Sequence, residues 1–496
     1  PMSHSSPSLS EIRDFKGTYP KQLIYLFGTE MWERFCFYGL RGMLTVFMVT
    51  QLGLGEKAAN LQYGAIQAFV YAFTFIGGVF ADKILGFQKS LFWGATLMIL
   101  GGFIIALAPT ELFYIGICFN IIGTGFFKPN ISTMVGQLYK DGDTRRDAGF
   151  GLFYTGINAG AFLGGLLMVW VGKEYSWRLA FALVGIVMII SLINFAYRRR
   201  SFGPIGLSPL PADMPAQRKR LMEIGTYIGS LITIPLIYKM VTNTAYTDMF
   251  MYIVGPATLV YLAWEMRTFT RAENRKLGAA LVFILFSILF WAFFEQSGGS
   301  LSLFALNNLH GTLFGVPMDP NAVNNSANSL FVIAFSALIG ILWMRMAKRG
   351  TEPNSVVKFG LGFLLLGAGF YIFKMTYGFA DAEGLTSMEV FTFAWFVITF
   401  GELCLSPIGL SLMTKLSPVR IQGLMMGMWF LASAYGQYVA GLLGAGMSSA
   451  DPNASNLQKL QNYTEGYGQL GLYALIAGGA LILIAPVVRK LMQDVH

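Results

Sequence analysis

Long apolar segments separated by short polar connections run along the whole 496-residue chain. A transmembrane α-helix needs about 20 consecutive, mostly apolar residues, and fourteen segments reach roughly that length. They fall near residues 22–50, 60–81, 90–108, 112–138, 148–172, 178–197, 221–240, 250–268, 278–297, 325–347, 357–378, 387–414, 420–447 and 467–488. The pattern therefore predicts an all-α polytopic membrane protein with 14 transmembrane helices.

A basic linker that carries several prolines separates the sixth segment from the seventh. The spacing predicts six helices, an inserted hairpin of two, and six more. As domains we predict a cytoplasmic N-terminal segment at 1–21, a six-helix bundle at 22–200, a cytoplasmic linker with a transmembrane hairpin at 201–276, and a second six-helix bundle at 277–496. No polar stretch is large enough for a separate enzyme domain, so we expect no enzymatic activity.

The Lys and Arg residues predict the orientation of these helices. They concentrate in connections that all fall on one side of the predicted spans, and an excess of Lys and Arg marks the cytoplasmic side. Both termini then lie in the cytoplasm of a cell whose inner (plasma) membrane holds the protein. The first twenty residues contain no apolar core of a signal sequence, so we expect no cleaved signal peptide.

Composition agrees with a membrane protein. Hydrophobic residues make up 55% of the chain and charged residues only 12%, against about 25% charged in a typical soluble domain. The net charge of +9 does not indicate nucleic-acid binding, because the basic residues lie mostly in short loops. The three cysteines lie in apolar segments and offer neither a disulfide framework nor zinc-ligand spacing. We therefore expect no metal and no cofactor.

Glycines at intervals of four mark predicted contacts between helices. Gly156, Gly160 and Gly164 share one helix face, as do Gly423 and Gly427. Helices in a membrane approach closely where such small residues line a face. Both runs lie in apolar segments, which favours close packing over a role in loops.

The first apolar segment carries four charged residues, Glu30, Glu33, Arg34 and Arg41. At 100° per residue, Glu30, Arg34 and Arg41 fall on one helix face, and Glu30 and Arg34 form an i,i+4 pair. Ionisable residues in a membrane usually face the bundle interior and mark substrate or proton paths. The sequence contains no intramembrane histidine, so carboxylates would carry protons.

Three further charged residues lie in later apolar segments. Lys128 is far from both ends of its segment, although a lysine can also extend to the interface. Glu295 is a candidate counter-charge for Lys128 or a residue at the outer end of its helix. Glu402 precedes Ser406 and Pro407 in a helix that we predict to continue about twelve residues further.

Several uncharged residues complete the candidate site. Asn158 and Asn328 fit either substrate contacts or interhelical hydrogen bonds. The aromatic residues Tyr38, Tyr71, Tyr154, Trp291 and Trp429 fit either pocket walls or helix packing.

The charged residues divide by sign between the two predicted bundles. Arg34, Arg41 and Lys128 bring cations to the first bundle, and Glu295 and Glu402 bring carboxylates to the second. A central cavity with opposite charges on opposite walls suits a zwitterion whose charges are separated. A short peptide is such a ligand, and carboxylates beside arginine can take and release protons as their pairing changes.

Four motifs carry a resemblance to known proteins. The segment 77–86 resembles the cytoplasmic loop motif of the major facilitator superfamily, with a faint counterpart at 340–349. Within that superfamily, EMWERFCFYG at 30–39, the segments 77–86 and 150–162, and FGE at 400–402 followed by Ser-Pro resemble the signatures of the proton-dependent oligopeptide transporters. The motifs extend from the first predicted helix to the tenth, hairpin not counted, and their joint occurrence is specific.

The resemblance implies the major facilitator fold and proton-coupled import of di- and tripeptides by alternating access. It implies proton coupling by Glu30, Glu33 and Arg34. It implies that substrate-binding residues are Arg41, Lys128, Tyr38, Tyr71, Tyr154, Asn158, Trp291, Glu295, Asn328, Glu402, Ser406 and Trp429. Among these, Arg41 and Lys128 would face the peptide carboxylate, whereas Asn158, Asn328 and Glu402 would hold the amine. Phe37 departs from the family pattern, which often has tyrosine there, so one substrate hydroxyl contact is absent.

Three other readings remain open. The chain could carry another small anion or zwitterion, such as nitrate or an amino-acid derivative, because the motifs favour proton coupling without naming the substrate. A receptor or channel is disfavoured because we find no repeated pore-lining segment. A membrane enzyme is disfavoured because metal-ligand spacing is missing. The oligomeric state, the peptide preference and the stoichiometry do not follow from the sequence.

Overall fold

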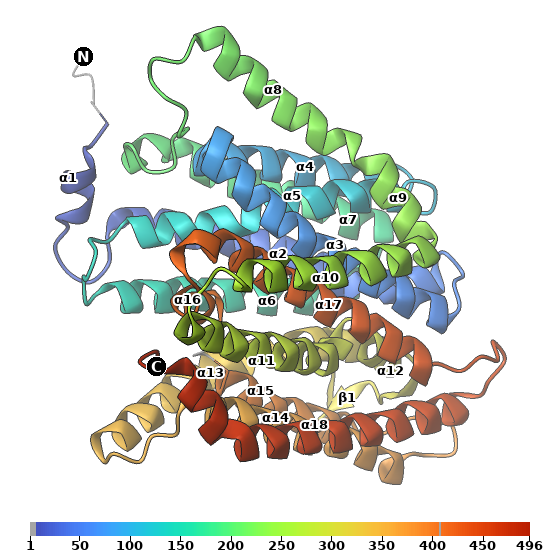
Figure 1. Ribbon diagram of the computed structural model, residues 1–496. Coiled ribbons are helices and arrows are strands. Elements are labelled where there is room, and N and C mark those ends of the chain that lie inside the picture. Colours follow the sequence, from blue (N-terminus) through green and yellow to red (C-terminus); the bar gives the residue numbers. More distant parts are fainter. Residues whose placement is uncertain (1–5, 406–407) are drawn as a thin grey trace. The chain divides into compact units, whose positions relative to one another are not determined.

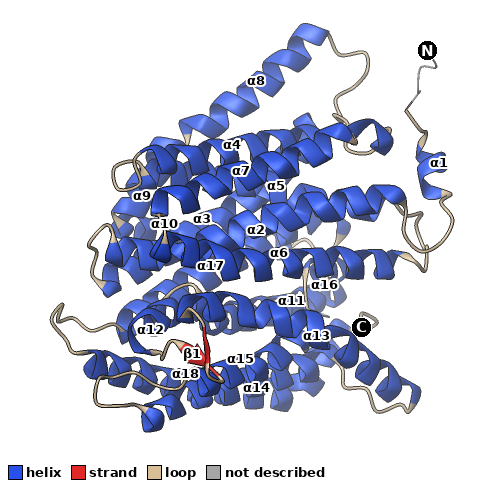
Figure 2. Cartoon of the chain, turned by 180° about the vertical axis from the view of Figure 1, so that it is seen from behind, coloured by secondary structure: helices blue, strands red, loops and turns tan. Residues whose placement is uncertain are grey.

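The computed structural model describes residues 6–405 and 408–496, and nearly all of its regular structure is helical (Figures 1 and 2). In chain order the elements are α1 (Leu9–Arg13), α2 (Lys21–Thr50), α3 (Glu56–Phe80), η1 (Ala81–Leu85), α4 (Phe87–Leu107), α5 (Phe113–Gln137), α6 (Arg146–Glu174), α7 (Trp177–Tyr197), η2 (Arg199–Phe202), α8 (Ala216–Ile232), α9 (Ile234–Thr242), α10 (Thr244–Met266), α11 (Arg271–Phe294), η3 (Glu295–Ser297), α12 (Ser300–Asn308), β1 (Thr312–Leu313), β2 (Val316–Pro317), α13 (Pro320–Lys348), α14 (Ser355–Met375), η4 (Thr376–Phe379), α15 (Met388–Leu403), α16 (Leu410–Lys415), η5 (Val419–Ile421), α17 (Gln422–Met447) and α18 (Asn456–Met492). The two strands form one short antiparallel ladder.

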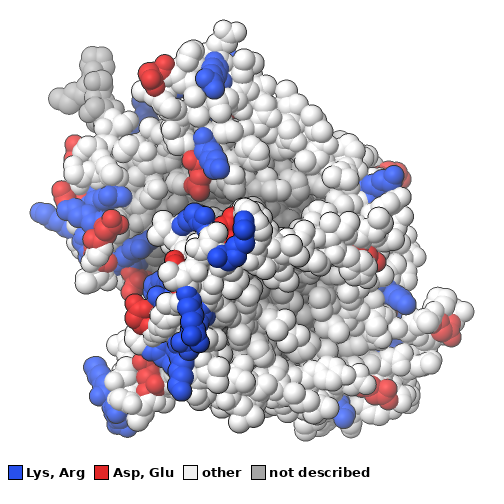
Figure 3. Space-filling model, viewed as in Figure 1, with Lys and Arg blue, Asp and Glu red and all other residues white. Residues whose placement is uncertain are grey.

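The long helices lie at the predicted membrane-spanning segments. Within the described residues, ten helices are long and apolar enough to cross a membrane by length and composition. Helices α2, α5, α15 and α17 lie at the four remaining predicted segments, so the structure fits 14 transmembrane helices. On the face drawn in Figure 3, most charged side chains gather toward the left, and much of the rest of that face is uncharged. Such a surface suits the hydrocarbon of a bilayer.

The chain forms two compact units. Unit 1 comprises Pro1–Met43 and Phe69–Thr242, and unit 2 comprises Leu44–Ala68 and Asn243–His496. In unit 1, α4 packs along α5 and α7; in unit 2, α14 packs along α18 and α15, and α11 packs along α17. The division into the four sequence segments proposed above stays a prediction.

The inserted hairpin divides between the two units at the step from Thr242 to Asn243. Helix α8 is fixed to unit 1, where Lys89 pairs with Glu223 at 2.7 Å and the Trp93 indole donates to the Ser230 hydroxyl at 3.0 Å. Helix α10 belongs to unit 2, where two tyrosines of α17 hold it, as described below. Each helix of the hairpin is therefore attached to a different unit.

The end of α2 and the first half of α3 also pack in unit 2, and Glu56 is the centre of their contacts. The Glu56 carboxylate is buried and accepts hydrogen bonds from the Asn307 amide and the Tyr463 hydroxyl, both at 2.6 Å. Lys459 lies 3.6 Å away and supplies a positive charge. A buried carboxylate needs such partners, so the network fixes the start of α3 on α12 and α18.

A glycine stripe brings α6 against α2, as predicted. A Cβ atom on Gly156 would lie 2.8 Å from the Phe27 ring, and one on Gly164 would lie 2.2 Å from the Phe35 carbonyl oxygen. On Gly160 it would lie 2.1 Å from a backbone oxygen of α2. The prediction is wrong at Gly423, where no described atom lies within 4 Å of the added carbon. A spacing of four marks a shared face, but only a facing helix makes it a contact.

The motif at 77–86 forms a close turn in unit 1. Its second part is the π-helix η1, and Gly86 follows with a φ of +77°, a conformation that favours glycine. A Cβ there would also lie 2.5 Å from the backbone of Leu207. The Gln88 side chain donates to the Ile205 carbonyl at 2.7 Å and fixes the linker over this turn.

The N-terminal segment packs against the loop before α6. The Arg145 guanidinium donates to the carbonyl oxygens of Phe15 and Gly17, at 3.0 and 2.7 Å, and lies over the Phe15 ring. The same guanidinium hydrogen-bonds Asp143 and lowers the pKa of that carboxyl below its usual value. Lys140 pairs with Asp14 on the same surface.

Two predictions about where helices and loops lie are wrong. The segment 387–414 is not one continuous helix, because α15 ends at Leu403, one residue after Glu402, and the next described helix begins at Leu410. Proline at 407 has no backbone N–H and disfavours helix in the residue before it, which explains the interruption. The predicted outer loops at 298–324 and 448–466 also contain helix, namely α12, the start of α13 and the start of α18.

Replacing Gly164 with alanine tests the glycine stripe. The new methyl group would overlap the Phe35 carbonyl, and such overpacking costs about 1–3 kcal/mol. We expect a lower melting temperature in detergent micelles. Gly151 lies on the same helix with open space around it, so Gly151→Ala should leave the melting temperature unchanged or raise it. Equal melting temperatures for the two variants would contradict the close contact.

Candidate functional site

An ion cluster in the middle of α2 forms the first part of the site. Glu30, Glu33 and Arg34 are each at most 2% exposed. The Arg34 guanidinium binds Glu33 with two nearly parallel hydrogen bonds, 2.5 Å from Nε and 2.6 Å from Nη2. Its Nε also lies 3.3 Å from Oε1 of Glu30. The structure therefore brings these three predicted residues into contact with one another.

The two carboxylates of this cluster are not equivalent. Glu33 has both oxygens hydrogen-bonded to Arg34, whereas Oε1 of Glu30 lies at the longer distance of 3.3 Å from the guanidinium. Among the described residues, the other Glu30 oxygen is buried and has no hydrogen-bond partner. One positive charge thus faces two carboxylates, and Glu30 is the one with room for a proton on its outer oxygen.

Aromatic rings connect this cluster to the next arginine along α2. The Arg34 guanidinium lies 4.4 Å from the centre of the Phe37 ring and 5.5 Å from that of Tyr38. The Arg41 guanidinium lies 5.5 Å from the same Tyr38 ring. Tyr38 therefore contacts both arginines, and the face predicted from helical spacing is continuous. Phe37 takes part as a ring beside Arg34, a contact that needs no hydroxyl.

Lys128 lies on α5, in the same unit as α2. Its ammonium group is 4.3 Å from the centre of the Tyr71 ring on α3, which is cation–π distance. Lys128 is partly buried. Pro129 follows it inside the helix, and the Asn130 amide donates to the Phe126 carbonyl at 2.6 Å. The structure thus groups Lys128 with Tyr71.

Helix α6 contributes Tyr154 and Asn158 to unit 1. The Tyr154 side chain is 42% exposed, and Asn158 is buried and donates to the Tyr154 carbonyl at 3.0 Å. This bond is within one helix, so Asn158 does not use it to join two helices.

In unit 2, Glu402 and Asn328 form a pair between α15 and α13. The Asn328 amide donates to Oε2 of Glu402 at 2.8 Å and to the Thr399 hydroxyl at 3.0 Å. Glu402 is partly buried near the end of α15. The structure therefore brings Asn328 and Glu402, two predicted site residues, into contact. Ser406, which we predicted beside them, lies outside the described residues.

Sequence reasoning missed three residues that position this pair. Thr399 precedes Glu402 by one helical turn and accepts from Asn328. One turn before Thr399, the buried Trp395 donates from its indole to Asn324 at 3.3 Å, and the Asn324 amide donates to the Ser297 carbonyl at 2.8 Å. The spacing of these residues could have indicated that they share helix faces. Positions 324 and 328 are four residues apart, and positions 395, 399 and 402 are three to four residues apart.

The remaining predicted site residues of unit 2 are Glu295, Trp291 and Trp429. Glu295 begins η3 directly after α11 and is 9% exposed. Trp291 packs edge-to-face on Phe294, with ring centres 5.1 Å apart. Trp429 lies on α17, partly buried against the hydrophobic core of unit 2. Within the described residues, no group of His, Cys, Asp and Glu could hold a metal ion.

The fold and the buried charges define a class of protein, a polytopic membrane transporter. Comparison with known proteins gives its family. The model of the POT family, the proton-dependent oligopeptide transporters, matches residues 88–460. The chain therefore belongs to the POT family, has the major facilitator fold, and is a transporter rather than an enzyme.

Individual relatives match over nearly the full length. The chain is 33% identical to the peptide transporter YePEPT of Yersinia enterocolitica subsp. palearctica, over 97% of both proteins. A crystal structure of a peptide transporter POT in complex with sulfate is 30% identical, with a TM-score of 0.83 over 99% of this chain and all of that one. A POT family transporter in complex with 5-aminolevulinic acid is 28% identical, with a TM-score of 0.82 over 97% of this chain and all of that one.

The different pairing of Glu30 and Glu33 predicts different effects on stability. Removing one partner of a buried ion pair costs about 3–5 kcal/mol, and Glu33 makes both short bonds to Arg34. We expect Glu33→Gln to lower the free energy of unfolding clearly more than Glu30→Gln, measured by denaturation in mixed micelles. A larger loss for the Glu30 variant would contradict the assignment of Glu33 as the main partner of Arg34.

Proposed function

We propose that this protein is a proton-coupled symporter that imports di- and tripeptides by alternating access. Family membership supports transport of small peptides. The observation that carries the proposal is the separation of charge. Arginine and lysine side chains gather in unit 1, and a carboxylate held by an amide, Glu402 with Asn328, lies in unit 2.

The cations of unit 1 suit the carboxylate end of a peptide. Arg41 and Lys128 come from α2 and α5, and each is held beside the ring of a tyrosine, Tyr38 or Tyr71. A ring face orients a cation, and the side chain keeps its positive charge. We propose that these two residues receive the peptide carboxylate, and that Tyr154 lines the space beside it.

The carboxylate of unit 2 suits the amino end. Asn328 donates to one Glu402 oxygen at 2.8 Å, and we propose that the peptide ammonium group binds this oriented carboxylate. Charge-assisted hydrogen bonds are roughly twice as strong as neutral ones. The hydrogen bond from Asn328 to the Thr399 hydroxyl also orients this pair. Glu295, Trp291, Asn158 and Trp429 are proposed as further wall residues.

The ion cluster on α2 suits proton coupling. Glu30 and Glu33 share one guanidinium, so a proton on Glu30 leaves one carboxylate on one cation. When Glu30 loses the proton, Arg34 must serve two carboxylates, and a second cation or an incoming proton becomes favourable. The proton gradient is then the only driving agent, with no organic cofactor. We place the protein in the cell inner membrane with both termini in the cytoplasm, on the basis of its Lys and Arg distribution.

A second candidate substrate is an amino-acid derivative with a free amine and carboxylate. The related POT family transporter in complex with 5-aminolevulinic acid favours it. Such a ligand presents the same two charges as a dipeptide, and the same residues would hold it. Counterflow of labelled dialanine into liposomes, with and without competing 5-aminolevulinic acid, separates the two. Failure of dialanine to exchange would overturn the peptide assignment.

Glu30→Gln tests proton coupling. The amide cannot release a proton, so we expect loss of dialanine accumulation driven by an inward proton gradient, with peptide exchange retained. Uptake and counterflow in liposomes measure the two activities. Glu11 is an exposed carboxylate on α1, so Glu11→Gln should behave as the wild type. Full proton-driven accumulation by the Glu30 variant would exclude it from coupling.

Glu402→Gln tests the amine site. Loss of a charge-assisted contact is worth roughly 1.5–3 kcal/mol, or about tenfold to a hundredfold in affinity. The variant should bind dialanine that much more weakly, while the affinity of its N-acetyl form changes little. Competition against labelled substrate measures both ligands. The exposed Glu383 provides the control Glu383→Gln. Equal discrimination by wild type and variant would show that Glu402 does not hold the amine.

A further inference from the structure

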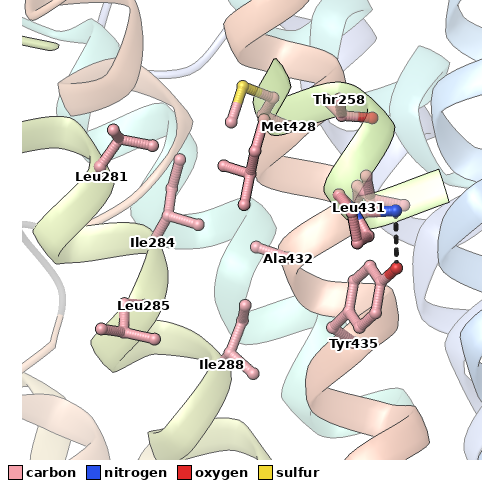
Figure 4. A pocket seen from close by; sticks show the side chains of 12 residues that line it. Thr258, Leu281, Ile284, Leu285, Ile288, Met428, Leu431, Ala432 and Tyr435 are labelled. Carbon is pink, nitrogen blue, oxygen red and sulfur yellow. Dashed lines mark hydrogen bonds between the residues drawn. The ribbon is translucent and has the colours of Figure 1, made fainter. Parts of the chain in front are cut away.

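An apolar groove lies on unit 2 between the hairpin helix α10 and the helices α11 and α17. Its volume is about 410 Å³. Figure 4 shows Ile284, Leu285 and Ile288 of α11 facing Met428 and Ala432 of α17, with Thr258 of α10 at the rim. Leu259 and Leu285 at its edges are more than half exposed, so the groove opens to the outside of the helices.

Tyr435 of α17 holds α10 in the position that leaves this groove open. Its hydroxyl donates to the Met251 carbonyl and accepts from the Gly255 N–H at 2.8 Å, so it sits within the hydrogen-bond ladder of α10 one residue before Pro256. Inserted groups and proline both bend helices. The Tyr438 hydroxyl donates to Asp248 and fixes the preceding turn. The groove is therefore built by specific bonds and is not a loose gap.

Arginines lie at one end of all three helices that form the groove. Arg267 follows the last residue of α10, Arg271 is the first residue of α11, and Arg420 lies just before α17. Arg420 pairs with Glu265 at 3.0 Å, and Arg267 lies over the exposed Trp264 ring at 4.6 Å. Exposed tryptophan and arginine together are typical of the interface between lipid tails and water.

The depth of the groove fits a lipid tail that starts at these arginines. At about 1.5 Å of rise per residue, Leu259 lies roughly 12 Å from Arg267 along α10, and Leu281 lies roughly 15 Å from Arg271 along α11. Half of the hydrocarbon core of a bilayer is about 15 Å thick. An apolar groove at that depth excludes water, and acyl chains are the apolar molecules around it.

We propose that this groove binds one acyl chain of an anionic phospholipid whose head group contacts Arg267 and Arg271. The lipid fills the space between the hairpin and the bundle and stabilises the attachment of α10 to unit 2. This site is independent of the peptide site and does not rest on the proposed transport.

Native mass spectrometry of the full chain in detergent tests the proposal. The protein is titrated with phosphatidylglycerol or with phosphatidylcholine of the same acyl chains. We expect one phosphatidylglycerol molecule to bind with higher affinity than any further lipid and than phosphatidylcholine. Binding of many molecules without one distinct site, or equal binding of both lipids by the wild type, would overturn the proposal.

Two sets of variants locate the site. Ala432→Trp fills the groove and should abolish the distinct site, and the smaller Ala432→Leu should weaken it if the tryptophan variant fails to fold. Ala337, exposed on α13 of the same unit, provides the control Ala337→Trp, which should bind as the wild type. Retention of the site in the two Ala432 variants would place the lipid elsewhere.

The head-group contact is tested by Arg267→Gln with Arg271→Gln. An arginine near a membrane surface contributes about 1 kcal/mol to anionic lipid binding, or about fivefold in affinity. The double variant should therefore lose most of the preference for phosphatidylglycerol over phosphatidylcholine and keep the acyl chain in the groove. An unchanged preference would exclude these arginines.

Discussion

One guanidinium held by two carboxylates inside a membrane helix is the interaction on which the rest of the site depends. Charged groups in lipid are costly unless they are paired, and α2 carries its own pairs, because Glu30 and Glu33 lie four residues and one residue before Arg34. The pairing is unequal, with two short bonds to Glu33 and one longer contact to Glu30. Because of this inequality, Glu30 can gain or lose a proton while the ion pair between Glu33 and Arg34 stays intact.

The residues around the cluster exclude water from it and allow a neighbouring helix to pack closely against it. Gly160 lets the backbone of α6 approach α2 directly beside Arg34, since a Cβ there would also lie 3.1 Å from the Arg34 Cβ. The rings of Phe37 and Tyr38 cover the guanidinium and extend the cationic face to Arg41. The glycine and the aromatic rings therefore both help to bury the charged side chains of α2.

The two units solve the problem of a buried carboxylate in different ways. In unit 1 the counter-charge is permanent and lies on the same helix. In unit 2, Glu402 accepts a hydrogen bond from the neutral amide of Asn328, and that amide also donates to the Thr399 hydroxyl. A carboxylate that an amide orients suits a cation that binds and then leaves. Of the hairpin helices, α8 belongs to unit 1 and α10 to unit 2.

Periodicity and composition alone determined the helical class, the positions of the long helices and the residues that share a face, because helical spacing is local. The pairing of Glu30 with Arg34 was predictable for that reason, and so was the glycine stripe on α6. Only the tertiary structure decided which partners meet. In the structure, Lys128 lies over the ring of Tyr71, and Asn328 donates a hydrogen bond to Glu402. Helix α15 ends at Leu403. The tertiary structure also attached Glu56 to Tyr463 across about 400 residues. Such contacts depend on how helices pack, and neither hydropathy nor spacing along one helix records that packing.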